Sequence, residues 1–299
     1  MRLKWGDLWH ALSMAWTKLK RSSGAWNSRL APTPSGLLHL GNILNFSLTS
    51  TLVRVSGGEL SLRIDDLDTE RSRPEYFEDI FATLGWLGFR WEHGPQTVEE
   101  FRAHYRQELH LARYRRHLDQ IPKYLCECTR SQVRARTSAP YDGHCRRKQL
   151  HWQGGKTQWR YYATDPAQDV VLWRKDDFPS YHLASLSDDL ALGVNLIVRG
   201  EDLREASEVQ KLLAHHLGVA GQAFEAAILW HHPLVLDPQG EKLSKSQPQN
   251  GGQSLRQEFA TPGELFRELS RRAQLPVVES LEEAREVWAS VLLENEPRR

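Results

Sequence analysis

The hydrophobic and polar positions of this 299-residue chain change between helical and strand periods along its length. Near the N-terminus, apolar residues recur every three or four positions, which predicts an amphipathic helix within an extension over residues 1–28. We expect this helix to pack on the body; contact with a membrane surface or an RNA is the alternative, and translation starting at Met14 would also explain the segment. The apolar positions are Trp5, Leu8, Trp9, Leu12, Trp16 and Leu19.

An alternation of helix and strand patterns follows. A helix-periodic apolar run at about 41–55 stops at Gly57 and Gly58, a strand pattern covers 59–64, and another helix is predicted at about 73–87. This order predicts an α/β fold with a parallel sheet. We also expect helical stretches within 97–119, strands at 170–173, 191–198 and 227–229, a helix at 206–217 ending at Gly218, and one or two helices after 246.

The amino-acid composition limits which classes of protein this chain can belong to. The chain is 40% hydrophobic and 26% charged with a formal net charge of +1, so any basic surface must be local. It has no apolar run of about 18 residues, and polar residues interrupt the first 25 positions, which argues against a spanning helix and a signal peptide. The three cysteines fall within 126–145, a clustered odd set that predicts a reducing, cytoplasmic location and a possible metal site.

Two segments about 200 residues apart carry the clearest chemistry. Arg29–Asn42 reads RLAPTPSGLLHLGN and places proline, glycine and a histidine just before the first predicted helix. Backbone N–H groups at a helix N-terminus with a nearby imidazole suit phosphate oxygens. Lys242–Ser246 reads KLSKS and puts two lysines on a loop, where they can neutralise charge that develops as pyrophosphate leaves. Together the segments predict a grip on a nucleoside triphosphate.

These segments resemble the R-[FL]-A-P-[ST]-P-[ST]-G…H-x-G-[HNS] and K-[ML]-S-K-[SQ] patterns of class I aminoacyl-tRNA synthetases of the glutamate group. The resemblance covers about 29–250. It implies a Rossmann-like catalytic domain over 29–246, a zinc-containing insertion at about 111–165 and a short helical C-terminal region over 247–299. It also implies ATP with Mg²⁺ as a substrate, with catalytic roles for His39, Lys242 and Lys245 and ATP contacts from His39, Gly41, Asn42 and Lys245.

The same resemblance implies an amino-acid pocket. Planar guanidinium groups suit a carboxylate-bearing substrate, which fits the two implied arginines, Arg29 and Arg199. Arg199 could instead form a structural ion pair with Asp66, Glu201 or Asp202. Asp65 stands where the family has glutamate, so the group expected to hold the substrate ammonium is one methylene shorter and could act through water. The implied glutamate-binding residues are Arg29, Leu30, Ala31, Pro32, Thr33, Asp65, Tyr181 and Arg199.

A C-x-C-x₁₂-Y-x₃-C pattern begins at Cys126 and ends at Cys145. Zinc takes four ligands, so three thiolates leave one position, and spacing alone favours His144 there. The resembling family uses the tyrosine, which implies a structural zinc site made of Cys126, Cys128, Tyr141 and Cys145; three reduced cysteines without metal are the alternative. The cations nearby could face RNA phosphates or form only a solvated surface: Arg130, Arg134, Arg136, Arg146, Arg147 and Lys148.

The length of the C-terminal region distinguishes members of the group. Only 53 residues follow Ser246, fewer than the large helical anticodon-binding part of a full-length glutamyl-tRNA synthetase needs. The chain therefore resembles the glutamyl-Q tRNA(Asp) synthetases, truncated paralogues that activate glutamate with ATP and transfer it to queuosine in the anticodon loop of tRNA(Asp). A monomer is expected. The alternatives are a shortened glutamyl-tRNA synthetase that charges a tRNA 3′ end, and a catalytically silent paralogue that binds tRNA or a partner enzyme.

Overall fold

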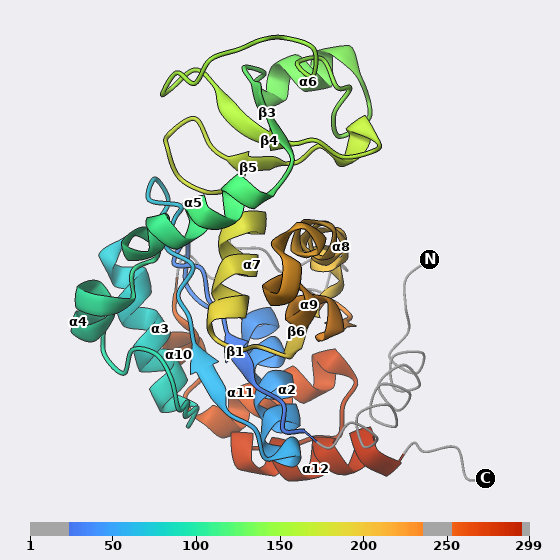
Figure 1. Cartoon of the computed structure of the whole chain (residues 1–299). Helices are drawn as coiled ribbons and strands as arrows, with labels where there is room; N and C mark the ends of the chain where they lie inside the picture. The colour runs from blue at the N-terminus through green and yellow to red at the C-terminus, as the bar shows by residue number, and fades with distance from the viewer. Residues whose placement is uncertain (1–23, 236–252, 295–299) are drawn as a thin grey trace. The chain divides into compact units, whose positions relative to one another are not determined.

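A computed structural model describes residues 24–235 and 253–294 of the chain (Figure 1). The predicted N-terminal helix and the KLSKS segment lie outside these residues. The chain forms two compact units: the first comprises Met1–Arg106, Val194–Arg204 and Ala227–Arg299, and the second comprises Gln107–Gly193 and Glu205–Ala226. Among the described helices, none combines the length and apolar content needed to cross a bilayer.

A parallel sheet organises the first unit. Strand β1 (Ser28–Leu30) pairs in parallel with β2 (Leu60–Leu62), and β6 (Leu196–Gly200) pairs in parallel with β7 (Ile228–His232). The backbone N–H groups of Asn195 and Leu196 both donate to the carbonyl oxygen of Asn27, at 3.0 and 3.1 Å, so β6 runs beside β1. The two-stranded sheets β1-β2 and β6-β7 therefore lie side by side in this unit, and the predicted α/β fold with parallel strands is confirmed.

Helix α2 (Leu40–Ser56) is the central helix of the first unit. It buries apolar and small polar residues around most of its circumference, including Ile43, Leu48, Ser47 and Ser50. Gly57 ends it in the left-handed conformation (φ 70°), which explains the stop that the sequence predicted there. Other helices of this unit are α3 (Pro74–Trp86), α4 (Val98–Glu100), α10 (Leu255–Glu258), α11 (Pro262–Ala273) and α12 (Leu281–Glu294).

The helices after residue 253 belong to the same core as the sheet. Trp288 on α12 is fully buried, and its indole N–H donates to the carbonyl oxygen of Pro276 at 3.0 Å. Arg285 donates from Nε and a terminal nitrogen to Ser50 Oγ, at 3.1 and 2.8 Å, which joins α12 to α2. In Figure 1 the red C-terminal helices lie beside the blue α2. The C-terminal helices therefore support the helix that carries His39 at its N-terminus.

The second unit contains a three-stranded antiparallel sheet in the order β3-β4-β5, seen together in Figure 1. Its strands are β3 (Lys123–Cys126), β4 (Gln158–Tyr161) and β5 (Val171–Trp173). Helices connect and flank them: α5 (Leu111–Gln120), α6 (Arg130–Arg136), α7 (Tyr181–Ala191), α8 (Arg204–Ala214) and α9 (Gly218–Ala226). Short 3-10 turns of this unit occupy Gln107–His110, Pro166–Gln168 and His215–Leu217. In the first unit, Glu201–Leu203 forms a 3-10 turn and Phe101–Tyr105 forms a short π-helix.

Some predicted elements were wrong in detail. The strand expected at 191–198 starts at Leu196, because Ala191 still belongs to α7. Gly218 does not end the helical region; it adopts a positive φ of 58° and turns the chain into α9. The sequence pattern also missed β3 and β4, and in β4 the buried positions include the charged Arg160. Periodicity fails where a charged side chain is buried against a specific partner.

Candidate functional site

Predicted site residues from several segments meet at the carboxyl edge of the parallel sheet. Arg29 lies on β1 and Arg199 on β6, and each is 3% exposed. Beyond β2 the chain continues alongside β1: Arg63 N–H donates to the Leu30 carbonyl, and Asp65 N–H donates to the Pro32 carbonyl, both at 2.9 Å. Open α/β sheets bind ligands at this edge. The first unit thus carries two buried arginines and a buried aspartate on segments that lie side by side.

The N-terminus of α2 supplies an anion-binding turn at the same edge. His39 is the N-cap residue, and its backbone N–H donates to Asn42 Oδ1 at 3.1 Å. A Cβ atom on Gly41 would come within 3.0 Å of the His39 ring, so glycine lets the imidazole lie against the first turn. Helix N-terminal N–H groups and the helix dipole favour negative charge. His39, Gly41 and Asn42 therefore form one turn that suits phosphate oxygens.

A buried carboxylate that sequence reasoning missed holds this turn in place. Asp79 on α3 is 4% exposed; it accepts a hydrogen bond from Leu38 N–H at 3.3 Å and another from Thr83 Oγ1 at 3.2 Å. Arg256 on α10 approaches Asp79 at 3.7 Å. An aspartate among buried positions of an apolar helix was the available signal, because a buried charge needs specific partners. Asp79 fixes the backbone that precedes His39.

Two histidines at the end of β7 were also missed. His232 Nδ1 contacts the Pro233 carbonyl oxygen at 2.8 Å and Nε2 contacts Asn45 Nδ2 at 3.1 Å. The carbonyl must accept and the amide must donate, so the ring is neutral with its proton on Nδ1. Asn45 also donates to the Val198 carbonyl at 3.1 Å, which ties α2 to β6. Burial lowers the pKa of His232, and burial together with neighbouring arginines lowers the pKa of His231 to about 4.

Asp65, the acidic residue of the predicted amino-acid pocket, and its neighbour Asp66 both have cationic partners. Arg63 contacts both carboxylate oxygens of the buried Asp65, from Nε to Oδ1 at 2.7 Å and from a terminal nitrogen to Oδ2 at 3.2 Å. Asp66 pairs with Arg106 at 3.4 Å. Tyr181 belongs to the second unit, where it begins α7 and is 38% exposed. The roles of Asp65, Tyr181 and Arg199 towards a substrate stay predictions.

The predicted zinc ligands lie together in the second unit. The three cysteine Sγ atoms are within 4.8 Å of one another, and the Tyr141 hydroxyl lies 3.4 Å from Cys126 Sγ and 3.9 Å from Cys128 Sγ. All four side chains are buried, and burial raises the pKa of Tyr141. His144 is exposed and does not join the cysteine cluster. Three thiols and one phenol form a compact donor set that fits tetrahedral zinc.

Neighbouring groups support this cysteine–tyrosine cluster. Arg160 on β4 places its guanidinium 3.9 Å from the centre of the Tyr141 ring. Arg136 donates to Cys128 Sγ at 3.4 Å and pairs with Asp142 at 2.7 Å. Such outer contacts orient metal ligands and offset the negative charge of thiolates. Two of the arginines near the cluster therefore have structural roles, which explains the buried cation in β4.

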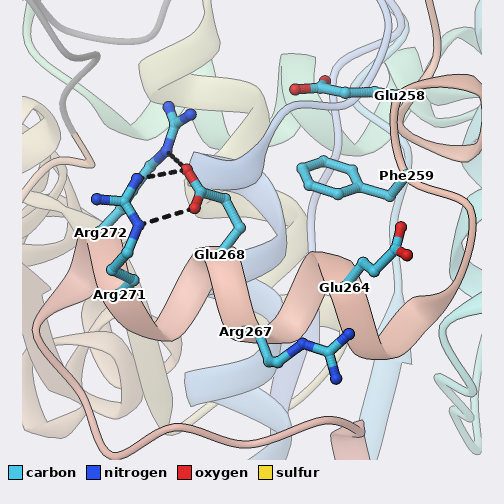
Figure 2. A pocket seen from close by; sticks show the side chains of 7 residues that line it. All are labelled: Glu258, Phe259, Glu264, Arg267, Glu268, Arg271 and Arg272. Carbon is cyan, nitrogen blue, oxygen red and sulfur yellow. Dashed lines mark hydrogen bonds and ion pairs between the residues drawn. The ribbon is translucent and has the colours of Figure 1, made fainter.

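A separate surface hollow of about 410 Å³ lies along α11. Figure 2 shows Glu268 facing both Arg271 and Arg272, with ion-pair distances of 2.8 and 2.5 Å. Arg267 pairs with Glu279 at 2.7 Å. Three of the arginines along this hollow are therefore held in ion pairs with glutamates. The residues that line it are Glu258, Phe259, Glu264, Arg267, Glu268, Arg271 and Arg272.

Comparison with known proteins identifies the family. Residues 26–154 match the model of the class I tRNA synthetases (E and Q), catalytic domain. A protein named glutamyl-Q tRNA(Asp) synthetase from Synechococcus sp. (strain CC9605) is 38% identical over 243 residues, which cover 79% of this chain and 78% of that protein. The chain belongs to the glutamyl-Q tRNA(Asp) synthetase family. This family is one of aminoacyl-tRNA synthetases, which are ligases.

Two further likenesses agree with this family. A glutamate--tRNA ligase from Thermosynechococcus vestitus is 33% identical over 73% of this chain, which spans only 51% of that longer protein. The crystal structure of a glutamate-tRNA synthetase from Elizabethkingia anophelis superposes with a TM-score of 0.69 at 23% identity. That match covers 88% of this chain and 66% of the other chain. The structural likeness confirms the class I synthetase fold predicted from the sequence.

The lowered pKa of His231 predicts a pH-dependent stability. Between pH about 6.5 and about 4, the unfolded chain binds a proton at this position that the folded chain does not, so the free energy of unfolding falls as the pH falls. We expect the drop in the free energy of unfolding between pH 7 and pH 4.5 to be about 2–3 kcal/mol smaller in His231→Asn than in the wild type. Chemical denaturation at pH 7 and pH 4.5 measures it, with the exposed His215→Asn as the control. Equal pH slopes for His231→Asn and the wild type would contradict the assignment.

Proposed function

We propose that this protein activates L-glutamate with ATP to form glutamyl-adenylate and then transfers the glutamyl group to the queuosine base of tRNA(Asp). The observation that best supports this proposal is that two buried arginines, Arg29 and Arg199, lie at the same sheet edge as the His39 turn. This arrangement supports an acidic substrate beside a nucleotide, and the names of the relatives support glutamate and tRNA(Asp). We assign 29–246 to the catalytic domain, 111–165 to its zinc-containing insertion and 247–299 to the C-terminal region.

In this proposal the nucleotide is held from two sides. The turn of His39, Gly41 and Asn42 binds phosphate oxygens of Mg²⁺-ATP through backbone N–H groups and the imidazole. Lys242 and Lys245 neutralise the leaving pyrophosphate. A carboxylate oxygen of glutamate attacks the α-phosphorus, the bond from that phosphorus to the bridging oxygen breaks, and pyrophosphate departs with the electron pair. The charge that moves onto pyrophosphate explains why cations beside it accelerate the step.

Glutamate is held by charge and by backbone in this proposal. Arg29 and Arg199 bind its carboxylates, and Asp65 binds its ammonium group. Asp65 also pairs with Arg63, and an ionised carboxylate has about four acceptor positions, so it can bind more than one cationic group. We also assign residues 30–33 to this pocket, and Tyr181 remains a predicted glutamate-binding residue. AMP leaves when the glutamyl group passes to the tRNA.

The cysteine–tyrosine cluster has a structural role in this proposal. Cys126, Cys128, Tyr141 and Cys145 would hold one Zn²⁺, which supplies folding free energy to the insertion and leaves no open coordination position for catalysis. The three cysteines are free thiols in the structure, which fits a reducing compartment such as the cytoplasm. We further propose that the protein acts as a monomer.

We predict ATP–pyrophosphate exchange that depends on L-glutamate and Mg²⁺ and needs no tRNA. Lys245→Ala should lower the exchange rate roughly 10²- to 10³-fold while the KM for ATP changes little, because its partner charge develops mainly in the transition state. Lys211→Ala, on an exposed position of α8, is the matched control. Exchange that requires tRNA, or that prefers aspartate or glutamine, would refute this assignment of the reaction.

Elemental analysis should find one zinc per chain. Tyr141→Phe should weaken zinc retention against a chelator, since the phenol oxygen lies among the thiols, whereas His144→Ala should retain zinc as the wild type does. Chelation should lower the thermal stability of the 111–165 region. Absence of zinc would end the metal proposal. Loss of zinc from His144→Ala with full retention in Tyr141→Phe would assign the fourth ligand to His144.

The role of Asp65 is tested by two substitutions. Asp65→Asn should raise the KM for glutamate and lower kcat/KM roughly ten- to hundredfold, because it removes a charge-assisted hydrogen bond to the ammonium group. Asp65→Glu should be tolerated. Steady-state kinetics over a panel of amino acids gives the answer, with Asp68→Asn as the control and unfolding curves to detect damage from the lost Arg63 pair. Unchanged kinetics in Asp65→Asn would remove this residue from the pocket.

A further inference from the structure

Positive charge is concentrated in the zinc-containing insertion. Residues 111–165 contain twelve lysines and arginines against four acidic residues, although the whole chain has a net charge of +1. Each of the four carboxylates has a partner: Asp119 contacts Lys123, Glu127 contacts Lys148, Asp142 contacts Arg136, and Asp165 accepts from Ala167 N–H. The acidic side chains are thus occupied, and a positive excess remains on the insertion.

The excess lies on exposed side chains. Within the part of the chain that the structure describes, five exposed cations of the insertion form no ion pair: Arg116, Arg130, Arg134, Arg147 and Lys156. Exposed cations without anionic partners attract a polyanion and release its counterions on binding. This charge pattern fits nucleic acid better than an apolar protein surface.

A pair of tryptophans stands in the same insertion. The rings of Trp152 and Trp159 are parallel, with planes 3° apart and centroids 6.5 Å apart, which is an offset-stacked arrangement. Trp152 is 37% exposed, and Lys123 Nζ lies 5.6 Å from the centre of the Trp159 ring. All positions of 151–156 are exposed, including Lys156. One short stretch of the insertion therefore carries two stacked indoles, of Trp152 and Trp159, together with Lys123 and Lys156.

Hydrogen bonds fix the loop that presents Trp152. Gln153 N–H donates to Thr157 Oγ1 at 2.8 Å, Thr157 N–H donates to the Gln153 carbonyl at 2.9 Å, and Gly155 N–H donates to the Lys175 carbonyl at 2.7 Å. Strand β4 carries Trp159 in register with Leu125 of β3. A preorganised aromatic surface binds with a smaller loss of conformational entropy. The exposed indole of Trp152 is thus presented by a loop that hydrogen bonds fix.

We propose that Trp152 and Trp159, flanked by Lys123 and Lys156, form a stacking platform for an unpaired base of the tRNA. Aromatic faces beside cations are the usual surface for single-stranded nucleic acid, because every base has a π-face and every nucleotide has a phosphate. This inference rests on the proposed function for the presence of tRNA. The platform binds the base, and the exposed cations bind the backbone that leads to it.

The test compares tRNA binding by variants of this platform. Trp152→Ala should raise the Kd for the anticodon stem-loop RNA of tRNA(Asp) roughly five- to hundredfold, and Trp152→Phe, which keeps an aromatic face, should restore most of the affinity. Affinity for a blunt RNA duplex of equal length should not change in Trp152→Ala, since its bases are paired. Lys156→Ala should weaken stem-loop binding and reduce the salt dependence by about one ion. Arg267→Ala on α11 is the control.

The outcomes separate this inference from the proposed function. Glutamate-dependent pyrophosphate exchange should be the same in Trp152→Ala as in the wild type. If the wild type showed no such exchange, the proposed activity would be refuted, while the RNA-binding result would still stand. Wild-type affinity of Trp152→Ala for the stem-loop would overturn the platform, as would equal weakening of stem-loop and duplex. If Trp152→Ala unfolds, Trp152→Phe and Lys156→Glu replace it in the test. Stem-loop binding that is about tenfold weaker in Lys156→Glu and nearly unchanged in Trp152→Phe supports the platform. Wild-type stem-loop binding by Lys156→Glu overturns it.

Discussion

The arrangement of the site depends on how the N-terminus of α2 is fixed against the sheet. Asp79 accepts the N–H of Leu38 just before the turn, and Asn45 bonds both the Val198 carbonyl and His232 one turn later. These contacts are buried or partly buried, where hydrogen bonds to charged or neutral partners orient a segment firmly. The N-terminus of α2 is therefore held in a fixed place relative to β1 and β6. An anion that binds there needs no large rearrangement of the backbone.

Part of this fold could be predicted from the sequence because its signals are local. Gly57 and Gly58 end α2, short strands alternate with helices, and the cysteines and Tyr141 fall within twenty residues, so that short loops bring them together. The sequence also predicted that His39 lies just before this helix, and in the structure it is the N-cap residue.

The rest could not be predicted because it depends on long-range partners. A charged residue such as Arg160 argues against a buried strand when only the sequence is known. Its contact with the Tyr141 ring, which makes its burial favourable, is seen only in the structure. Asp79 and Arg256 are 177 positions apart, and Asn45 meets His232 across 187 positions. The ion pair between Arg63 and Asp65 is local, yet the sequence pattern alone could not tell whether Asp65 contacts an arginine or a substrate. The KLSKS segment and the amphipathic N-terminal helix lie outside the described residues.

The most direct test of the account is where glutamate is attached. Radiolabelled glutamate, Mg²⁺-ATP and the protein are incubated with tRNA(Asp) that carries queuosine, with the same tRNA without queuosine, and with queuosine-bearing tRNA that lacks its 3′-terminal adenosine. The account predicts label in the anticodon fragment of both queuosine-bearing tRNAs and none in the tRNA without queuosine. Label that requires the 3′-terminal adenosine and ignores queuosine would contradict it and would favour a shortened glutamyl-tRNA synthetase.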